Sequence, residues 1–501
     1  MTTSETASAR NVTAWLRRTV SSTADITLDS RAVKPGSVFV ALKGARCDGL
    51  LWARKAIQAG AAAVLYEPRD ETPALSVPSL AVPGLRRMLG VVASDFYGAP
   101  SSLMAGIGIT GTNGKTSISH WTSALLTHLG RPCAAIGTIG TFFKGERFPS
   151  PSLTTPDAAS TQTLMKQLHA AGAGAFAIEA SSIGLEQGRL DGTTFKTAVF
   201  TNLTRDHLDY HKTLEAYEAA KAILFDWPGL ACAVINAEDA AGRRLAARTV
   251  GRGVRTIAYA TRETAALENV EVLRADEIRP TDSGTAFVVH WQGRRYEVQA
   301  RTLGRFNVSN LLAAAGAVLS LGEDPERVMA QLSRIEPPAG RLQVLAQENA
   351  PLCVVDYAHT PDALEKVLVA LRDTVGHRGG RLRVIFGAGG DRDHGKRPLM
   401  GMTASRLADA VVVTSDNPRS EDPASIIDMV LAGCGEARSL ESIIDRREAI
   451  MKTVFAAEAR DVILVAGKGH EDYQEIMGVK HHFSDVEVVR DALKRRKEQT
   501  N

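Results

Sequence analysis

The sequence predicts an α/β protein of three domains, in which mostly parallel sheets are covered by helices. The chain has 501 residues, which is enough for about three domains that each bury a core. Short apolar segments typical of strands alternate with longer segments typical of helices. A glycine-rich turn joins one such strand, at residues 104–109, to a predicted helix at residues 117–129.

Composition and charge narrow the class of protein. Hydrophobic residues make up 44% of the chain and the net charge is +3, which indicates neither a nucleic-acid nor a membrane-surface partner. No signal-peptide core is present, and the longest apolar run, residues 311–321, is too short to span a bilayer. Five scattered cysteines indicate free thiols in a reducing compartment. We therefore expect a cytoplasmic protein without a membrane span, and we expect a monomer.

The three predicted domains are residues 1–99, 100–339 and 340–501. The boundaries carry the Gly and Pro residues typical of linkers, at 97–101 and 337–340. Strands are expected at 37–42, 63–66, 104–109, 175–178, 197–201, 233–236, 352–355, 382–386, 410–414 and 462–466. A helix is expected at 51–59, and the alternating segment 285–299, with Gln292-Gly293 as its turn, is expected to be an antiparallel hairpin. The third domain reads as doubly wound, with ligand loops at the carboxyl ends of its strands.

The glycine-rich turn predicts a phosphate-binding site. It reads Gly-Ile-Thr-Gly-Thr-Asn-Gly-Lys-Thr-Ser over residues 108–117. Backbone N–H groups of such a turn face inward, the helix N-terminus and Lys115 add positive charge, and the Thr116 hydroxyl is a candidate Mg²⁺ ligand. An ordinary glycine turn is the alternative, because Ile109 stands where the strict motif has its first glycine. The candidate nucleotide-binding residues are Gly111, Thr112, Asn113, Gly114, Lys115, Thr116 and Ser117.

Polar residues follow two further strands of the second domain. Glu179 follows one strand, and Asn202, Asp206 and His207 follow the next. If the strands are parallel, these loops leave the same edge of the sheet as the phosphate-binding turn. A carboxylate and an imidazole beside ATP phosphates suit Mg²⁺, whereas a glutamate alone at a strand end is more simply a surface charge.

The turn Thr-Gly-Thr-Asn-Gly-Lys-Thr resembles the ATP loop of the Mur ligases and of folylpolyglutamate synthetase, which join an amino acid to a carboxylate. The resemblance to the Mur ligases covers essentially the whole chain in the same order. It is carried by residues 29–31, 36, 39, 44, 48–49, 202–211, 217–221, 304–311, 340–341 and 356–361. It implies a small N-terminal α/β uridine-binding domain, a central ATPase domain of the phosphate-loop type, and a C-terminal Rossmann-like domain.

The resemblance also implies roles for single residues. Lys221 alone reads as a lysine beside the apolar face, formed by Leu214, Tyr217, Ala220 and Leu224, of a helix predicted at 214–225. In the Mur ligases the matching lysine is carbamylated, and the resulting anion helps to hold a second Mg²⁺. The implied catalytic residues are Lys115, Glu179, His207 and Lys221; the implied metal ligands are Thr116, Glu179, His207 and Lys221. On the nucleotide side the implied residues are Asn310, Arg341 and Asp356.

The turn Asp416-Asn417-Pro418-Arg419 indicates which amino acid is used. Proline fixes the turn, and Arg419 can bind a carboxylate through two hydrogen bonds. The far end of meso-diaminopimelate carries a carboxylate that lysine lacks, so lysine would leave the guanidinium unpaired. A surface salt bridge is the alternative for Arg419 considered alone. The resemblance adds Arg392, Gly467 and Glu471 as contacts of the amino acid, with Glu471 expected to hold its distal ammonium.

The second substrate implied by the resemblance is UDP-MurNAc-L-Ala-D-Glu. The residues implied to contact it are Leu28, Ser30, Ala45, Arg46, Cys47, Thr154, Thr155, Ser181, Gln187 and Arg189. One departure is clear, since many relatives have histidine after the two serines where this chain has Ile183. No role of that histidine can be transferred.

The function implied is that of an ATP-dependent amide ligase in peptidoglycan precursor synthesis. It would add meso-diaminopimelate to the γ-carboxylate of D-Glu through an acyl phosphate, with ATP, Mg²⁺ and a carbamate on Lys221. Three alternatives stay open: the same ligase using L-lysine, a folylpolyglutamate-synthetase-like ligase, and a nucleotide-binding scaffold without activity. Residues 29–31 argue against the second, and Lys115, Glu179, His207 and Lys221 argue against the third.

Overall fold

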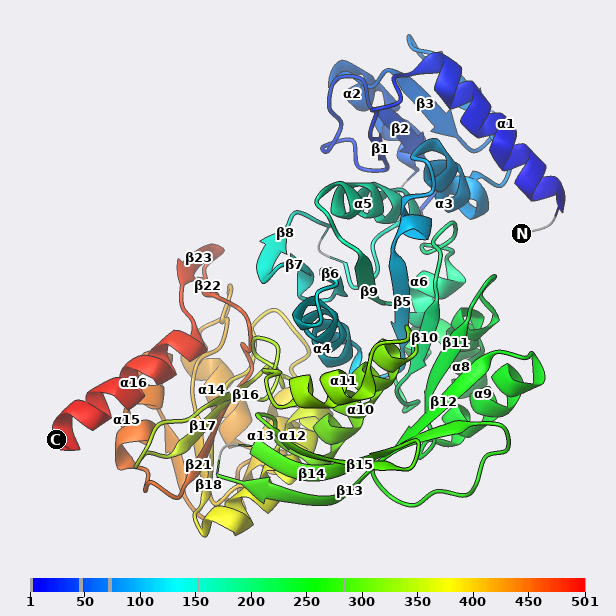
Figure 1. The fold of residues 1–501 in the computed structure, drawn as a ribbon. Helices are drawn as coiled ribbons and strands as arrows, with labels where there is room; N and C mark the ends of the chain where they lie inside the picture. The colour runs from blue at the N-terminus through cyan, green and yellow to red at the C-terminus, as the bar shows by residue number, and fades with distance from the viewer. Residues whose placement is uncertain (1–2, 45–47, 71–73, 152, 283, 501) are drawn as a thin grey trace. The chain divides into compact units, whose positions relative to one another are not determined.

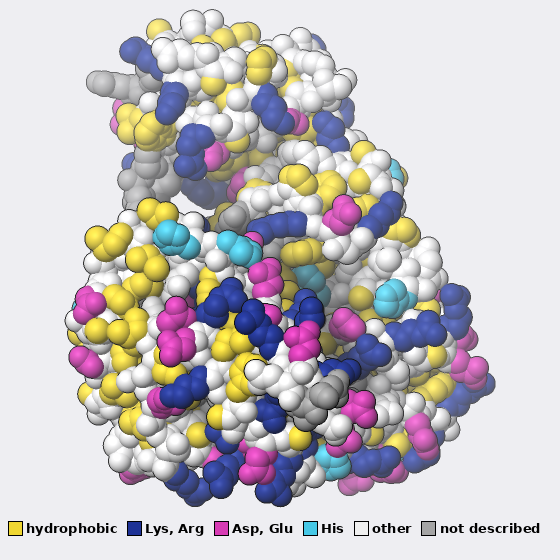
Figure 2. Space-filling view, turned by 90° about the vertical axis from the view of Figure 1, so that its left-hand side faces the viewer, with side chains coloured by type: hydrophobic (Ala, Val, Ile, Leu, Met, Phe, Trp, Pro, Cys, Tyr) yellow, Lys and Arg dark blue, Asp and Glu magenta, His cyan; other side chains and the backbone are white. Residues whose placement is uncertain are grey.

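The computed structural model describes residues 3–44, 48–70, 74–151, 153–282 and 284–500 (Figure 1). Two compact units are present, each with α/β architecture. The first unit is Met1–Leu273 with Ala313–Val328, and the second is Arg274–Leu312 with Met329–Asn501. Basic and acidic side chains are interspersed over the face seen in Figure 2, so this face carries no large area of one charge sign.

The first unit begins with a four-stranded parallel sheet. Its elements are α1 (Thr3–Thr19), β1 (Ile26–Thr27), β2 (Val38–Ala41), α2 (Ala53–Gln58), β3 (Ala63–Tyr66), β4 (Ser79–Ala81) and α3 (Leu85–Phe96). The strand order is β1-β2-β3-β4. Side chains alternate across a strand, so Val38 and Val40 of β2 pack with residues of α1 and α3, while Phe39 and Ala41 pack on the face that α2 covers. The strand predicted at 63–66 is confirmed with the same bounds, and the predicted strand at 37–42 and helix at 51–59 are confirmed with shorter bounds.

A second sheet of this unit carries the phosphate-binding turn. Its elements are β5 (Ala105–Thr110), α4 (Lys115–His128), β6 (Cys133–Gly137), β7 (Gly140–Phe143), β8 (Glu146–Phe148), α5 (Ala158–Ala170), β9 (Ala175–Glu179), α6 (Ser182–Glu186), β10 (Thr197–Phe200), α7 (Leu208–His211), α8 (Leu214–Ala222), β11 (Cys232–Asn236), α9 (Ala240–Gly251) and β12 (Arg255–Ala260). The order is β12-β11-β10-β5-β9-β6-β7-β8, parallel as far as β6. The carboxyl ends of β5, β9 and β10 therefore meet at one edge, as the sequence predicts.

In the second unit an antiparallel meander precedes a doubly wound sheet. The elements are β13 (Glu271–Thr281), β14 (Gly284–Trp291), β15 (Arg294–Ala300), α10 (Arg305–Leu319), α11 (Pro325–Leu332), β16 (Gln343–Leu345), β17 (Leu352–Asp356), α12 (Pro361–Arg378), β18 (Leu382–Phe386), α13 (Lys396–Leu407), β19 (Ala410–Val413), α14 (Pro423–Leu431), β20 (Leu440–Ser442), α15 (Arg446–Ala456), β21 (Val462–Ala466), β22 (Tyr473–Ile476), β23 (Val479–His482) and α16 (Asp485–Thr500). β13, α10 and α11 cross the division of the chain. The main sheet has the order β16-β17-β21-β18-β19-β20.

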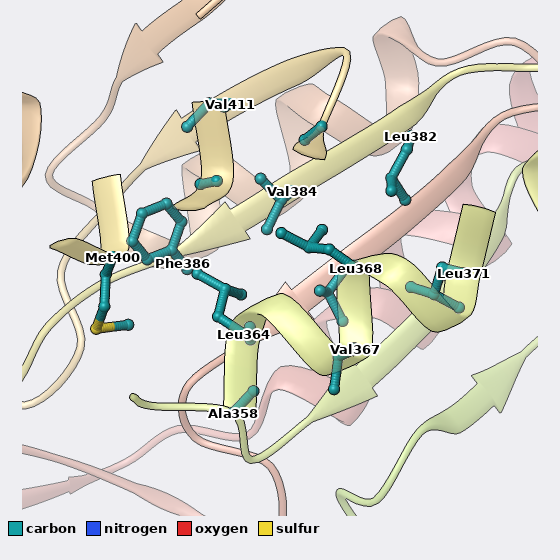
Figure 3. Close-up of a cluster of buried hydrophobic side chains, with 14 of the residues drawn as sticks. Ala358, Leu364, Val367, Leu368, Leu371, Leu382, Val384, Phe386, Met400 and Val411 are labelled. Carbon is teal, nitrogen blue, oxygen red and sulfur yellow. The ribbon is translucent and has the colours of Figure 1, made fainter. Parts of the chain in front are cut away.

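Helices cover both faces of this main sheet. On one face Val384 and Phe386 of β18 pack with Leu364 and Leu368 of α12 and with Met400 of α13 (Figure 3). The opposite face, reached by alternate residues such as Ile385, packs with α15 and α16. Helices on two faces of a largely parallel sheet define the doubly wound arrangement that the sequence predicts.

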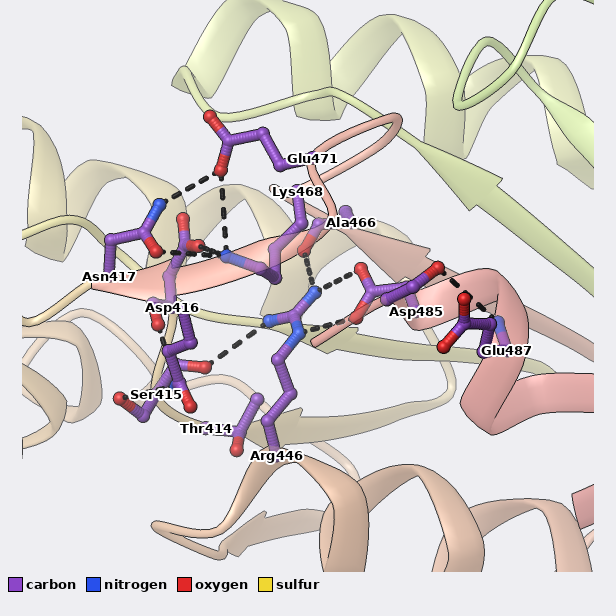
Figure 4. A network of polar contacts seen from close by, with 12 residues as sticks. Thr414, Ser415, Asp416, Asn417, Arg446, Ala466, Lys468, Glu471, Asp485 and Glu487 are labelled. Atoms are coloured by element: carbon purple, nitrogen blue, oxygen red, sulfur yellow. Dashed lines mark hydrogen bonds and ion pairs between the residues drawn. The ribbon is translucent and has the colours of Figure 1, made fainter. Parts of the chain in front are cut away.

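A fully buried ion pair joins α15 to α16. The Nε and Nη2 atoms of Arg446 each donate to one oxygen of Asp485 at 2.7 Å, and Nη2 also donates to the carbonyl of Ala466 (Figure 4). Both side chains are 0% exposed. Each oxygen of the Asp485 carboxylate accepts a hydrogen bond from Arg446, so neither buried charge is left without a partner, which would be costly.

The structure can be compared with the sequence in two further features, the state of the cysteines and the character of the helices. Four cysteines lie in the described residues, and all four are buried free thiols: Cys133, Cys232, Cys353 and Cys434. Burial raises the pKa of Cys133 to about 12, which keeps that thiol protonated. None of the helices in the described part of the chain has both the length and the apolar character that crossing a membrane requires.

Candidate active site

The phosphate-binding turn needs glycine at Gly111. Its φ is +142°, and a Cβ there would lie 1.8 Å from the Thr201 hydroxyl oxygen. Gly114, with φ +89°, is the N-cap residue of α4, so the turn ends directly at the helix N-terminus. These close contacts fix the turn against the strand end of β10, and the first residues of α4 supply N–H groups without helical partners.

Residues after β10 hold the turn in shape. The Thr112 N–H donates to the carbonyl of Asn202 at 2.8 Å, and the Asn113 N–H donates to the Asn202 side-chain oxygen at 3.0 Å. The Thr201 hydroxyl donates to the carbonyl of Asn113 at 2.6 Å. The Lys115 ammonium donates back to the carbonyls of Gly111 and Thr112, at 2.8 and 2.9 Å. The turn is therefore ordered by its own protein contacts.

Glu179, at the end of β9, lies beside the start of α4. Glu179 is 1% exposed. It accepts from the Thr116 hydroxyl at 2.9 Å, from the Thr138 N–H at 2.9 Å and from the Thr138 hydroxyl at 3.1 Å. A Cβ at Gly137 would lie 1.9 Å from the Glu179 oxygen, so that position also requires glycine. The alternative of a surface charge is wrong for Glu179.

Lys221 is buried against the same turn. Its side chain, 1% exposed, donates to the carbonyl of Gly111 at 2.9 Å, and its Nζ lies 4.1 Å from the ring centroid of Tyr217. Desolvation, together with the positive charge of Lys115, lowers the pKa of Lys221 to about 6. The predicted apolar positions Tyr217 and Ala220 of α8 are buried, and so is Leu224, which lies in the 3₁₀ turn Ile223–Asp226 because α8 ends before the predicted bound. Leu214 is 41% exposed because it opens the helix.

His207 takes an exposed position in the structure. It is the N-cap residue of α7, with φ +52°, and its Nε2 lies 3.6 Å from an oxygen of Asp206. Among the described residues it makes no hydrogen bond or ion pair with Glu179 or Thr116, and no group of three or more His, Cys, Asp or Glu side chains is placed to hold a metal ion. Because Mg²⁺ needs few protein ligands, the lack of such a group does not contradict a Mg²⁺ site. The roles of Thr116, Glu179, His207 and Lys221 as metal ligands stay a prediction.

Residues predicted to contact the UDP-linked substrate form a hydrogen-bonded chain near Glu179. The Thr155 hydroxyl donates to the Glu179 carbonyl at 2.7 Å and pairs with the Ser181 hydroxyl at 2.9 Å. Arg189 donates to the Thr155 carbonyl and to the side-chain oxygen of Gln187. Thr154 pairs with Thr138 at 3.1 Å, and Leu28 and Ser30 are half-buried. Ala45, Arg46 and Cys47 lie outside the described residues.

Three residues predicted to contact the nucleotide belong to the second unit. Asn310 is buried and donates to Asn307 at 3.2 Å. The buried Asp356 carboxylate accepts from the N–H groups of Leu342 and Ala358, at 2.8 Å each, and desolvation raises its pKa despite these bonds. The Arg341 guanidinium lies 5.1 Å from the centroid of the Tyr357 ring. Their role in nucleotide binding stays a prediction.

Residues predicted to contact the amino acid come together around Lys468, which is buried (Figure 4). Its ammonium donates to the Asn417 oxygen at 3.0 Å and lies 3.4 Å from Asp416 and 3.5 Å from Glu471. The Asn417 amide donates to Oε2 of Glu471 at 2.9 Å. A Cβ at Gly467, whose φ is +119°, would lie 3.3 Å from Asp416. Two carboxylates, those of Asp416 and Glu471, thus share one lysine, and the role of this cluster in binding the amino acid stays a prediction.

Arg419 is partly buried, with 22% of its side chain exposed. Its Nη1 donates to the carbonyl of Gly390 at 2.6 Å, and its Nε lies 3.6 Å from Oε2 of Glu475. The alternative of a surface salt bridge fits Arg419 only in part, because the side chains of Arg419 and Glu475 are both mostly buried. Arg392 is exposed and makes no hydrogen bond among the described residues. The structure thus brings Arg419, Asn417 and Glu471 into one region and adds Lys468 and Glu475, which the sequence did not single out.

The comparisons with known proteins agree with this arrangement. Three family models match the chain: "Mur ligase family, catalytic domain" at residues 23–97, "Mur ligase middle domain" at 109–318, and "Mur ligase, glutamate ligase domain" at 340–469. Relatives named UDP-N-acetylmuramoyl-L-alanyl-D-glutamate--2,6-diaminopimelate ligase include those of Ralstonia nicotianae, 48% identical over 96% of this chain and 95% of the relative, and of Pseudomonas aeruginosa, 49% identical over 94% of each.

Solved structures of ligases are also similar to this chain. A structure of a UDP-N-acetylmuramoyl-L-alanyl-D-glutamate--2,6-diaminopimelate ligase is 37% identical, with a TM-score of 0.71 over 94% of this chain and 95% of the other. A ligase from Acinetobacter baumannii that is 18% identical, with a TM-score of 0.63 over 94% of this chain and 93% of the other, shares the fold. The chain belongs to the Mur ligase family. The predicted resemblance and fold class are confirmed.

Proposed function

We propose that this chain is an ATP-dependent, ADP-forming amide ligase that joins meso-diaminopimelate to the γ-carboxylate of D-Glu in UDP-MurNAc-L-Ala-D-Glu. Relatives with this name are 48–49% identical over nearly the full length. Within the chain, the observation that carries the choice of amino acid is Arg419, whose guanidinium lies in the region of Asn417 and Glu471. A carboxylate and an ammonium on one carbon, as at the far end of diaminopimelate, match an arginine and a glutamate.

The proposed reaction has two steps, with an acyl phosphate as the intermediate. A γ-carboxylate oxygen of D-Glu attacks the γ-phosphorus of ATP, ADP leaves, and an acyl phosphate forms. The amine of diaminopimelate then attacks the acyl carbon, phosphate leaves and the nitrogen loses a proton. Lys115 and the N–H groups at the start of α4 would bind phosphate oxygens, and Lys115 would exchange its contacts with Gly111 and Thr112 for them.

The residues around Glu179 fit Mg²⁺. The Thr116 hydroxyl and a buried carboxylate lie 2.9 Å apart at the helix N-terminus, and both offer oxygen ligands. When bound, Mg²⁺ supplies positive charge that stabilises the transferring phosphoryl group. Thr138 holds the carboxylate in place through two hydrogen bonds.

Burial supports a carbamate on Lys221. A pKa near 6 leaves this amine mostly neutral at neutral pH, and only the neutral amine attacks CO₂. The nitrogen bonds to the CO₂ carbon, a proton leaves, and a carbamate anion replaces the neutral amine. The anion would then be available to a second Mg²⁺.

A cytoplasmic location and a monomeric state remain predictions.

Phosphate release from ATP tests the proposal. With UDP-MurNAc-L-Ala-D-Glu present, meso-diaminopimelate should support turnover and L-lysine should support little. Arg419→Ala should weaken the use of diaminopimelate by roughly 1.5–3 kcal/mol in kcat/KM, the usual worth of a hydrogen bond to a charged group, without changing the KM for ATP. A wild type that prefers lysine would move the assignment to the lysine-adding ligase, and no phosphate release with either would support the scaffold.

A further inference from the structure

One strand holds the turn that is expected to bind the amino acid. The Gln474 amide, on β22, donates to the carbonyl of Asp416 at 2.7 Å, and the Glu475 N–H donates to the Asn417 side-chain oxygen at 2.9 Å. The Arg419 N–H in turn donates to the Glu475 carbonyl at 3.0 Å. Three of the four residues of the turn are therefore bonded directly to residues 474–475.

The same strand end fixes the backbone at Arg419. The Met477 N–H donates to the Arg419 carbonyl at 2.6 Å, and Arg419 forms an isolated parallel bridge with Ile476. Arg419 has φ +52°, which is unfavourable for a residue with a side chain. An arginine in this conformation is held by its surroundings, and here the surroundings include both backbone bonds to residues 475–477.

The guanidinium of Arg419 has protein contacts at two of its three nitrogens. Nε faces Oε2 of Glu475 at 3.6 Å, an ion-pair distance beyond that of an N–H···O hydrogen bond. Nη1 donates to the carbonyl of Gly390. Among the described residues no hydrogen bond involves Nη2. A guanidinium has five N–H donors, so the edge formed by Nη1 and Nη2 keeps donors for a ligand.

We propose that Glu475 is a positioning residue for the amino-acid substrate: it fixes the Nε side of Arg419 and directs the distal carboxylate of diaminopimelate to the Nη1–Nη2 edge. This inference rests on the proposed function. A carboxylate fixed at Nε repels a second carboxylate from that side and leaves the opposite edge as the favourable one. Because Glu475 attracts Nε without forming a full hydrogen bond, it orients the guanidinium and leaves its other donors available.

A double-mutant cycle on the full chain tests the inference. Glu475→Gln keeps the shape of the side chain and every backbone bond of β22 and removes only the charge. We expect the KM for meso-diaminopimelate to rise about fivefold, as for coupled side chains in contact, with kcat and the KM for ATP unchanged. In an Arg419→Ala background, Glu475→Gln should cause no further change. Glu436→Gln, which removes the same charge from an exposed position of the second unit, is the matched control and should leave all constants unchanged.

The outcomes separate the inference from the proposed function. The weak use of L-lysine, which has no distal carboxylate, should be the same in wild type and in Glu475→Gln. A lower KM for diaminopimelate in Glu475→Gln would mean that Glu475 competes with the substrate, and an unchanged KM, or an equal rise without Arg419, would also overturn the inference. A wild type inactive with diaminopimelate would contradict the proposed function itself.

Discussion

The Nζ atom of Lys221, on α8, lies 2.9 Å from the carbonyl oxygen of Gly111, the residue that opens the phosphate-binding turn. The lysine is buried, its pKa is lowered to about 6, and Lys115 is the second cause of that shift. A neutral amine thus contacts the loop in which a cationic one is expected to bind phosphate. Desolvation thus lowers the pKa of the α8 lysine that contacts this loop.

The first prediction concerns Lys115. Lys115→Ala should lower kcat by about a hundredfold or more, because it removes a charge directed at the transferring phosphoryl group. Thermal unfolding should show a folded protein, and phosphate release gives the rate. Lys494→Ala, at an exposed lysine of α16, should retain full activity. Near-normal turnover in folded Lys115→Ala would remove the phosphate-binding assignment of this turn.

The second prediction concerns the carbamate. Lys221→Ala should be inactive, because neither the amine nor its carbamate remains. Short carboxylic acids such as acetate should restore part of the activity by supplying an anion, and they should not affect Lys115→Ala. Full activity of the wild type in CO₂-free buffer, together with the mass of an unmodified lysine, would contradict a required carbamate.

The third prediction concerns pH and Lys221. The pKa of Lys221 is about 6 in the folded chain against an ordinary value of 10.5, so between these values the unfolded chain binds more protons. Stability then rises with pH in that window. Compared with Lys221→Met in CO₂-depleted buffer, the free energy of unfolding of the wild type should increase as pH rises from 6 toward 10. A difference between the two proteins that stays constant over this range would show that the folded-state pKa is not lowered.

The fourth prediction concerns the Arg446–Asp485 pair. Asp485→Asn leaves the buried guanidinium without its counter-ion, and we expect a loss of about 3–5 kcal/mol in the free energy of unfolding. Asp491→Asn, which removes a partner of the exposed Arg495, should cost under about 1 kcal/mol. Urea unfolding measures both. Equal effects of the two substitutions would mean that burial does not set the strength of the first pair.

Much of the fold could be predicted from the sequence, because the buried parallel strands are short apolar runs with clear limits. The strand Leu382–Phe386 is buried on both faces and has the bounds that the sequence predicts. Strands without such a pattern were missed. Of β23, Val479–His482, all four residues are exposed, and β8, Glu146–Phe148, lies at a sheet edge where polar residues are tolerated. Their position depends on partners distant in the sequence.

The candidate site likewise contains residues that the sequence predicts and residues that only the structure reveals. Glu179 and the phosphate-binding turn were predictable, since polar residues directly after parallel strands meet at one edge of the sheet. In the sequence Lys468 is only a lysine between two glycines, and Glu475 is only one polar residue outside the predicted strands. Lys468 contacts Asn417 from the loop after β21, and Glu475 contacts Arg419 from β22; no local pattern encodes such contacts.

The sequence by itself determined which residues could do the chemistry: a glycine turn that ends in Lys115, a carboxylate after a neighbouring strand, and an arginine in a proline turn. Those are local patterns, readable because backbone geometry and residue type fix them. The tertiary structure decided the state of the charged groups. Burial makes Lys221 a weak base, and Glu475 restrains one side of Arg419. Desolvation and pairing depend on every neighbour in space, so they exist only once the chain has folded.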